Sequence, residues 1–369
     1  MTEITTVADL LRRGDATAEA IGAPGRKPMT RGQLMELIDQ ARGALRAVGV
    51  GGEDAVGNVM PNGPENAAAF LAVACWATAA PLNPGYREDE FDFYLGDLNA
   101  KALIIQAGPD APARAVAARR GIRVIELIPD ETGPAGAFNL SVPFANAGSA
   151  QPSPDHVALV LHTSGTTSRP KIVPLRHGNL AASARHIAAT LALTPSDRSL
   201  VIMPLFHIHG LIGALSSSLY AGASVFCPPG GFNALKFFAW ADEAKPTWYS
   251  AVPTMHQAIL ARAGRNADIL ARIKLRFIRS SSSSLPPQVM KQLEETFHCP
   301  VIEAYGMTEA THQMASNPLP PRARKPGTVG IAAGPEVAIM DNDGHLLPHG
   351  ATGEIVIRGP NVTAGYANN

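Results

Sequence analysis

Apolar residues recur along this chain with alternating helical and strand periods. Thr30 and Gln33 form a capping-box pattern, and the apolar positions that follow keep helical spacing as far as Gly49 (34, 38, 41 and 45). Short apolar runs at 55–60, 102–105 and 123–127 predict strands, with helical stretches between them. Strands that alternate with helices are typical of an α/β unit.

The alternation is interrupted once and then changes character near the end. Residues 130–155 are rich in Pro, Gly, Ala and Ser, so we expect a linker there. After it we predict a helix at 288–297 and strands near 157–161, 200–203, 224–227, 247–251, 276–279 and 301–304. From Lys325 onward, the β segments 337–340 and 354–358 flank a turn at 341–344, which favours a hairpin. The predicted parts are 1–155, 156–324 and a β-rich 325–369.

The composition indicates a protein of two or three subdomains without a strongly charged partner. The chain has 369 residues, which is more than one compact core usually holds. Its 31 basic and 31 acidic residues give zero formal net charge, so nothing favours nucleic acid or an anionic membrane. Prolines, glycines and histidines interrupt the uncharged stretch 199–235, which predicts strand–loop–helix–strand rather than a membrane span.

The cysteines and the N-terminus indicate a reducing compartment. Cys75, Cys227 and Cys299 are far apart in the sequence, in apolar or Pro-flanked contexts. We expect buried thiols rather than a disulfide or zinc framework. The first residues carry an acid early and lack the basic region of a signal peptide. These features predict a cytoplasmic protein.

The most informative stretch is a hydroxyl-rich loop that ends in a lysine. Between Leu161 and Lys171 come, in order, Thr163, Ser164, Gly165, Thr166 and Thr167. Hydroxyls, glycine-freed backbone N–H groups and one ammonium suit a polyphosphate, although a polar surface turn is the alternative for the loop alone. The phosphate loop of phosphoryl-transferring NTPases fits poorly, because Pro170 precedes the lysine and Ile172 stands where a magnesium-binding hydroxyl is needed.

A second cluster follows the apolar run 300–302. Its residues are Glu303, Ala304, Tyr305, Gly306, Met307, Thr308 and Glu309. Ligands of open α/β sheets bind at the carboxyl ends of strands, where this cluster is expected. Tyr305 offers a flat ring, Thr308 a hydroxyl and Glu309 a carboxylate for a hard cation such as Mg²⁺. Each residue taken singly also fits a structural role.

In this order and at this separation, the two clusters resemble those of the adenylate-forming superfamily of acyl-CoA synthetases, peptide-synthetase adenylation domains and luciferases. The resemblance covers the whole chain, and further matching segments are 82–84, 206–210, 251–253, 325–327, 353–355 and 365–366. It implies an α/β fold class, with two α/β subdomains whose mixed or parallel sheets are flanked by helices in αβαβα layers. The start of a small β-barrel subdomain would follow.

The resemblance also implies a reaction. A carboxylic acid and ATP would give an acyl-adenylate and pyrophosphate, and coenzyme A would then take the acyl group. The loop from Thr163 to Lys171 would hold the β- and γ-phosphates, and Thr308 the α-phosphate. Glu309 and Thr166 would hold Mg²⁺. The nucleotide site would be completed by Glu303 to Met307, with Tyr305 stacked on adenine, and by the serine run Ser282, Ser283 and Ser284 as a wall for the base; a flexible linker is the alternative for that run.

Polar residues where the superfamily has its acyl pocket favour a small acid with a polar far end. They are His207, His209, Ser250, His256, His312 and Gln313. A single histidine is more often structural, and this alternative applies to His209 and His256. Segments 247–257, 282–285 and 307–320 resemble the oxalate–CoA ligase branch. This resemblance predicts oxalate or a similar short dicarboxylate, with His207, Ser250 and His312 on the distal carboxylate and His207 beside Lys171, Thr308 and Glu309 in catalysis.

The chain departs from the superfamily pattern in two ways. Ser168 and Ile172 replace glycines of the phosphate loop, and Ile172 tolerates positive φ poorly. The superfamily continues past a segment like Gly365-Tyr366 with a small C-terminal domain, so we expect the large domain of a longer enzyme, with little activity alone. Other functions stay open: a synthetase for another short or medium-chain acid, a carrier-protein adenylation domain, or a nucleotide-binding module without catalysis.

Overall fold

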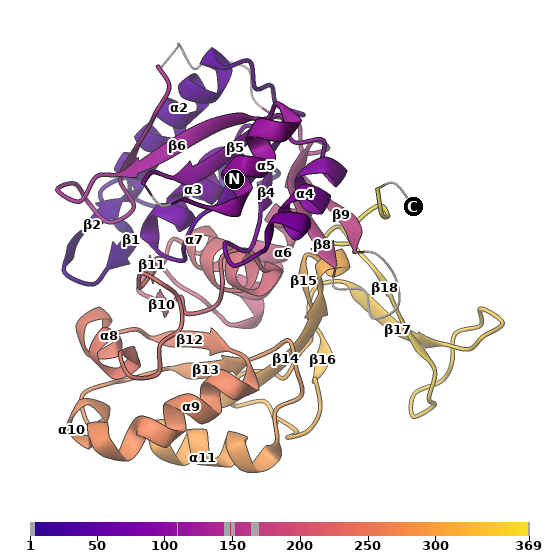
Figure 1. Cartoon of the computed structure of the whole chain (residues 1–369). Helices are drawn as coiled ribbons and strands as arrows, with labels where there is room; N and C mark the ends of the chain where they lie inside the picture. The colour runs from indigo at the N-terminus through magenta and orange to yellow at the C-terminus, as the bar shows by residue number, and fades with distance from the viewer. Residues whose placement is uncertain (1–3, 109, 144–147, 149–151, 164–169, 368–369) are drawn as a thin grey trace.

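Two mixed β-sheets form the framework of the chain (Figure 1). The computed structural model describes residues 4–108, 110–143, 148, 152–163 and 170–367. Within these residues, one sheet has the strand order β7-β6-β5-β3-β4-β8-β9. Its strands are β3 (Ala55–Val59), β4 (Thr78–Pro81), β5 (Ala102–Gln106), β6 (Arg123–Pro129), β7 (Phe138–Leu140), β8 (Val157–Thr163) and β9 (Lys171–Arg176).

The second sheet has the order β16-β15-β14-β13-β12-β10-β11-β1-β2 among the described residues. Its strands are β1 (Glu19–Ala23), β2 (Arg26–Thr30), β10 (Arg198–Leu200), β11 (Ser224–Phe226), β12 (Trp248–Ala251), β13 (Phe277–Ser280), β14 (Val301–Met307), β15 (His312–Ser316) and β16 (Ile331–Ala332). The strands from β1 to β14 along this order pair in parallel, whereas β2, β15 and β16 pair antiparallel. The carboxyl ends of the parallel strands therefore share one edge.

Helices lie between and outside the sheets. They are α1 (Val7–Leu11), α2 (Arg31–Ala47), α3 (Pro64–Ala74), α4 (Glu88–Asp97), α5 (Pro112–Arg120), α6 (His177–Thr190), α7 (Ser217–Tyr220), α8 (Phe237–Ala244), α9 (Pro253–Ala263), α10 (Ala267–Leu270) and α11 (Pro287–Phe297), with short turns η1 (His209–Ser216), η2 (Gly264–Asn266) and η3 (Thr308–Ala310). Helix α3 contacts β1 of one sheet and β3 and β4 of the other, and α6 likewise contacts β8, β9 and β15. Helices α9 and α11 cover the far face of the second sheet (Figure 1). The layered α/β fold is confirmed.

The local sequence signals explain several of these elements. The Thr30 hydroxyl accepts a hydrogen bond from the backbone N–H of Gln33, and the Gln33 side chain bonds back to Thr30, so α2 begins with the expected capping box. The uncharged stretch 199–235 folds into β10, η1, α7 and β11, and no helix within the described residues has the length and apolar character to span a bilayer. The three cysteines are buried free thiols, as expected.

Other expectations need correction. The stretch 130–155, expected to be a linker, contains strand β7, which pairs with β6. Strand β10 ends at Leu200, so the strand expected at 200–203 lies earlier, whereas β14 runs on to Met307 and includes residues expected to follow it. Ile172 lies within β9 without positive φ, so this residue itself carries no backbone strain.

The C-terminal part of the described chain is a hairpin, and the two sheets both draw strands from either side of the expected boundary at 155/156. Strands β17 (Glu336–Met340) and β18 (Glu354–Arg358) pair antiparallel and form the predicted hairpin, which projects from the body (Figure 1). No closed barrel forms within the described part of the chain. The division at 155/156 stays a prediction, although β1 and β2 join the second sheet and β8 and β9 join the first.

A buried carboxylate, that of Asp197, joins the amino ends of strands β10, β12 and β13 in the second sheet. Asp197 is 2% exposed, and its oxygens accept hydrogen bonds from Thr194, Thr247 and Arg276. Burial alone would raise its pKa, but the hydrogen bonds from Thr247, Arg276 and Thr194 outweigh burial, so the pKa of Asp197 lies below its usual 3.8. A lowered folded-state pKa means that the stabilisation is complete at neutral pH and is lost as pH falls through that pKa.

Asp197→Asn should therefore lower the free energy of unfolding at pH 7 by about 2 kcal/mol, because charged hydrogen bonds are replaced by neutral ones. The difference from wild type should shrink in acid, below about pH 4. Urea unfolding at pH 7 and pH 3 measures both effects. Asp242→Asn, at an exposed ion pair, is the control and should cost less. An unchanged stability at pH 7 would contradict this role for Asp197.

Candidate functional site

The candidate site lies where four parallel strands of the second sheet end. His207 follows β10, Ser250 lies in β12, the serines follow β13, and Tyr305 lies near the end of β14. Because these strands are parallel, their carboxyl ends place the four segments at one edge, the usual ligand-binding edge of α/β sheets. Residues spread over about a hundred positions of sequence are thereby brought together.

A cavity of about 300 Å³ lies between β14 and the serines at the end of β13 and after it (280–284), here called the serine loop. It is lined by Ser280, Ser282, Ser283, Ser284, Glu303, Ala304, Tyr305, Gly306, Gly327, Thr328 and Val329. The Ser281 hydroxyl donates to the carbonyl of Ala304 at 3.0 Å and fixes the loop against the strand. The predicted nucleotide residues 282–284 and 303–306 thus share one cavity, whereas Met307 and Thr308 do not line it. Their roles in binding stay predictions.

Strand β14 turns sharply into β15, and glycine makes the turn possible. A Cβ on Gly306 would lie 1.4 Å from the carbonyl oxygen of His312, so only glycine fits the strand at this point. Thr311 and His312 have φ of 50° and 96°, which is strained for residues other than glycine. The turn is held by Ser183, which donates to the Thr311 carbonyl, and by Asn361, which donates to Ala310. The tight turn therefore fixes the position of the buried His312.

Lys171 and Glu309 both contact Tyr366. Thr163 and Lys171 face each other in the hairpin of β8 and β9. The Lys171 ammonium lies 4.7 Å from the ring centroid of Tyr366, and the Tyr366 hydroxyl donates to Glu309 at 2.7 Å. The structure thus brings the expected phosphate-loop lysine beside the expected metal-binding turn. Ser164, Gly165, Thr166 and Thr167, predicted between Thr163 and Lys171, lie outside the described residues.

The residues at this turn suit a magnesium ion. Glu309 is half-buried, and Tyr366 bonds one of its oxygens; the other makes no hydrogen bond within the described residues. A carboxylate oxygen that faces water is the ligand that Mg²⁺ prefers, usually together with substrate phosphates and waters. Glu309 therefore fits the predicted metal-binding role, while Thr166 cannot be placed.

A cluster of histidines extends from the cavity into the core, and His209 is its centre. His209 lies in the π-helical turn η1, a form that often marks functional sites. Its Nε2 lies 2.6 Å from the Ser250 hydroxyl and its Nδ1 lies 3.0 Å from the hydroxyl of Ser282, which lines the cavity. Its ring stacks on His312 at 4.9 Å between centroids. His209, for which the sequence left a structural role as the alternative, joins the cavity to the cluster.

Arg279 is the charged member of the cluster and is fully buried. It contacts Ser250 at 3.4 Å, Nε2 of His312 at 2.9 Å and the side-chain oxygen of Gln313 at 3.2 Å. Because a guanidinium only donates, Nε2 of His312 must accept, and the His312 proton therefore lies on Nδ1. No acidic side chain pairs with Arg279 within the described residues, and its Nε has no hydrogen-bond partner there.

The histidines of this cluster are neutral near neutral pH. Burial holds the pKa of His209 and of His312 well below the usual range, and the charge of Arg279 adds to the effect. Burial also lowers the pKa of Arg279 to about 9, so the guanidinium stays charged at neutral pH. The cluster therefore carries the positive charge of Arg279, surrounded by neutral groups. His207 is exposed, and its proximity contributes to the lowered pKa of His209.

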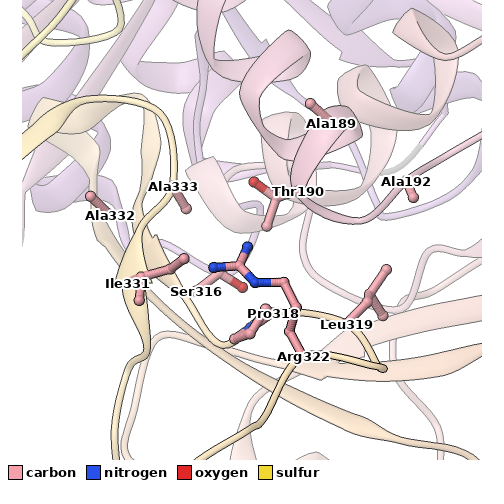
Figure 2. A pocket seen from close by; sticks show the side chains of 10 residues that line it. All are labelled: Ala189, Thr190, Ala192, Ser316, Pro318, Leu319, Arg322, Ile331, Ala332 and Ala333. Carbon is pink, nitrogen blue, oxygen red and sulfur yellow. The ribbon is translucent and has the colours of Figure 1, made fainter.

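A second cavity, of about 250 Å³, lies between the end of α6 and the strands β15 and β16 (Figure 2). Figure 2 shows the exposed Arg322 side chain reaching in among Ala189, Thr190, Ala192, Ser316, Pro318, Leu319, Ile331, Ala332 and Ala333. None of the residues predicted for catalysis or binding lines it. Its lining is largely apolar, and the convergent polar groups lie instead around the first cavity.

Comparison with known proteins decides the family. The model of the AMP-binding enzyme family matches residues 10–367. The chain belongs to this family. The chain is also similar to a probable CoA ligase, CCL9, of Humulus lupulus (46% identity, 99% of this chain, 71% of the relative). It is similar to oxalate–CoA ligases of Arabidopsis thaliana (44%, 95% and 69%) and Saccharomyces cerevisiae (43%, 86% and 62%).

The fold comparison agrees with the family assignment. ATP-bound MatB from Rhodopseudomonas palustris superposes with a TM-score of 0.84 at 27% identity, over 99% of this chain and 72% of that one. The predictions of an adenylate-forming AMP-binding enzyme and of an AMP-forming acid–thiol ligase are confirmed. The chain spans 62% to 71% of the length of these curated relatives.

Two residues of this AMP-binding enzyme's site escaped the sequence analysis. Arg279 is a charged residue in an apolar strand directly before the serine run, and that unusual position was an available signal. Tyr366 was noted only as part of a matching segment. Its contact with Lys171 and Glu309 joins positions about two hundred and about sixty residues away, so no local pattern indicates it.

Gly306→Ala should disrupt the site, because its Cβ would collide with the His312 carbonyl. We expect a loss of about 3 kcal/mol of stability from overpacking, together with weaker ATP binding. Thermal unfolding and calorimetric titration with ATP measure the two effects. Gly264→Ala is the matched control, since its Cβ would meet open space. Equal behaviour of the two variants would show that the tight turn is not required.

Proposed function

We propose that this AMP-binding enzyme activates a short dicarboxylic acid, with oxalate as the best candidate, and transfers it to coenzyme A. The observation that carries the proposal is the polar cluster of Ser250, His209, Arg279 and His312, which His209 joins to the cavity wall through Ser282. A long-chain or aromatic acid would place apolar atoms against these groups and leave them without partners, which is strongly unfavourable. The similarity to two oxalate–CoA ligases supports the same substrate.

The proposed reaction has two steps. A carboxylate oxygen attacks the α-phosphorus of ATP, the α–β phosphoanhydride bond breaks, and pyrophosphate leaves with that electron pair. The sulfur of coenzyme A then attacks the acyl carbon, AMP leaves, and the thiol proton passes to solvent. No covalent bond to the protein is needed, so its residues act by positioning and charge stabilisation.

The residues around the cavity and the β14–β15 turn have distinct proposed roles. Tyr305 and Ser282 to Ser284 hold adenine in the cavity that they line. Thr308 donates to the α-phosphate, and Lys171 neutralises charge on the departing phosphates. Glu309 binds Mg²⁺, which when present offsets negative charge on the phosphates. His207, exposed beside the cluster, borders the acyl end, and His312 binds the distal carboxylate. Ser250, already bonded to His209, acts by holding that ring rather than by reaching the acid. We further propose a cytoplasmic location.

A panel of acids tests the substrate in the intact enzyme. Acid-dependent exchange of labelled pyrophosphate into ATP should be strongest with oxalate or another short dicarboxylate. Hexanoate and benzoate should give at least about tenfold less exchange, the discrimination expected when buried polar groups are left unpaired. Stronger exchange with the fatty or aromatic acid would contradict the proposal.

Glu309→Gln tests the metal site. The substitution keeps an acceptor for Tyr366 but removes the negative charge, so the Mg²⁺ concentration for half-maximal activity should rise at least about tenfold. Tyr366→Phe is the control, because it removes the hydrogen bond to Glu309 and leaves the carboxylate in place. An equal rise in both variants would mean that Glu309 acts through Tyr366 rather than on the metal.

A further inference from the structure

The strongest unexplained feature of the molecule is the uncompensated charge of Arg279. The side chain is fully buried, and its contacts are a serine hydroxyl, a histidine nitrogen and an amide oxygen, all neutral. Burying a cation without an anion is costly, and such groups usually have a carboxylate partner. No ion pair within the described residues includes Arg279, in contrast to Arg276 directly before the same strand, which pairs with Asp197.

The contacts of Arg279 point toward the cavity. Arg279 donates to Nε2 of His312, which places the His312 proton on Nδ1. That Nδ1 makes no hydrogen bond within the described residues, so its N–H is free to donate to a ligand. The His312 ring stacks on His209, and His209 bonds Ser282 at the cavity wall. A chain of contacts therefore leads from the buried charge to the cavity.

Close packing fixes this arrangement. A Cβ on Gly213, in η1, would lie 2.6 Å from Nε2 of His312 and 3.1 Å from His209, so a glycine there lets both rings approach the turn. On the other side, Gln313 accepts from Arg279 and donates to Thr190 and to the Ala333 carbonyl. The guanidinium is thus held in place without being neutralised.

Resting on the function proposed above, we infer that Arg279 is the positioning residue that selects a dianionic acid. Its positive charge attracts the second carboxylate of the substrate. It also holds His312 in the tautomer that donates a hydrogen bond to that carboxylate. Arg279 acts on the acid through its contact with His312 rather than by touching it. A monocarboxylate leaves the charge uncompensated, whereas a short dicarboxylate compensates it through His312.

Substitutions of Arg279 in the intact enzyme test this inference, with the KM for ATP as an internal reference for folding. Arg279→Met should raise the KM for oxalate about 30-fold or more and leave the KM for ATP within about threefold, as expected when one partner of a buried charge pair is removed. Arg279→Lys keeps the charge and should lie between Met and wild type. Lys274→Met removes an exposed charge just before the same strand and should match wild type.

A second variant tests the charge without removing the arginine. Gln313→Glu places a carboxylate where the amide oxygen accepts from Arg279, so it should neutralise the guanidinium and also raise the KM for oxalate selectively. This variant decides the question if Arg279→Met does not fold.

The possible results separate the inference from the function on which it rests. An unchanged KM for oxalate in Arg279→Met and Gln313→Glu, or an equal rise in both KM values, would overturn the inference alone, as would Arg279→Lys behaving like Arg279→Met. A wild-type enzyme that accepts only monocarboxylates would overturn both the inference and the proposed function. A selective rise for oxalate with partial rescue by lysine would support it.

Discussion

The close approach of β14 and β15 is the constraint on which the candidate site depends. Gly306 passes against the backbone of His312 at a distance that admits no side chain, and the three-residue turn η3 leaves little freedom between them. Residues before the turn line the cavity, Glu309 in the turn meets Tyr366, and His312 after it points back to the core. One strand reversal therefore sets the positions of the base, the phosphates and the acid in the proposed function.

The strain at this turn is balanced by its surroundings. Thr311 and His312 adopt left-handed backbone conformations, and Ser282 does so across the cavity, each at a cost of about 1–3 kcal/mol. Hydrogen bonds from Ser183 and Asn361 hold the turn, and His209 holds Ser282. The buried charge of Arg279 adds a further cost. Strain and unpaired charge concentrated in one place are typical of a functional site, where stability is lost for the sake of positioning.

Much of the fold could be predicted from the sequence because its signals are local. The capping box at Thr30, the strands at 55–60, 102–105 and 123–127 and the hairpin of β17 and β18 follow from spacing and turn residues alone, whereas β1, β2 and β4 were not predicted. Strand β7 was missed because a three-residue strand in a Pro- and Gly-rich stretch carries no periodicity. β1 and β2 join the second sheet, and β8 and β9 join the first. These pairings are between segments far apart in the sequence, so no local pattern predicts them.

The site was predictable only in part, for a related reason. Motifs at strand ends indicated the cavity proposed here for the nucleotide, since parallel strands gather their carboxyl ends. The contacts of individual side chains could not be predicted. From the sequence alone, His209 also fits an ordinary buried histidine, and Arg279 is only the last residue of a predicted strand. Their importance follows from contacts over about thirty to seventy positions of sequence, which only the folded structure reveals.

The central claim is that one crevice beside the β14–β15 turn holds both the nucleotide and the acid. A crystal structure with a stable analogue of the oxalyl-adenylate tests it most directly. The account predicts adenine between Ser282–Ser284 and Tyr305, with the acyl end at the His209 and His312 rings. Density for the analogue in the cavity beside Arg322, or an acyl end directed away from the histidines, would contradict it.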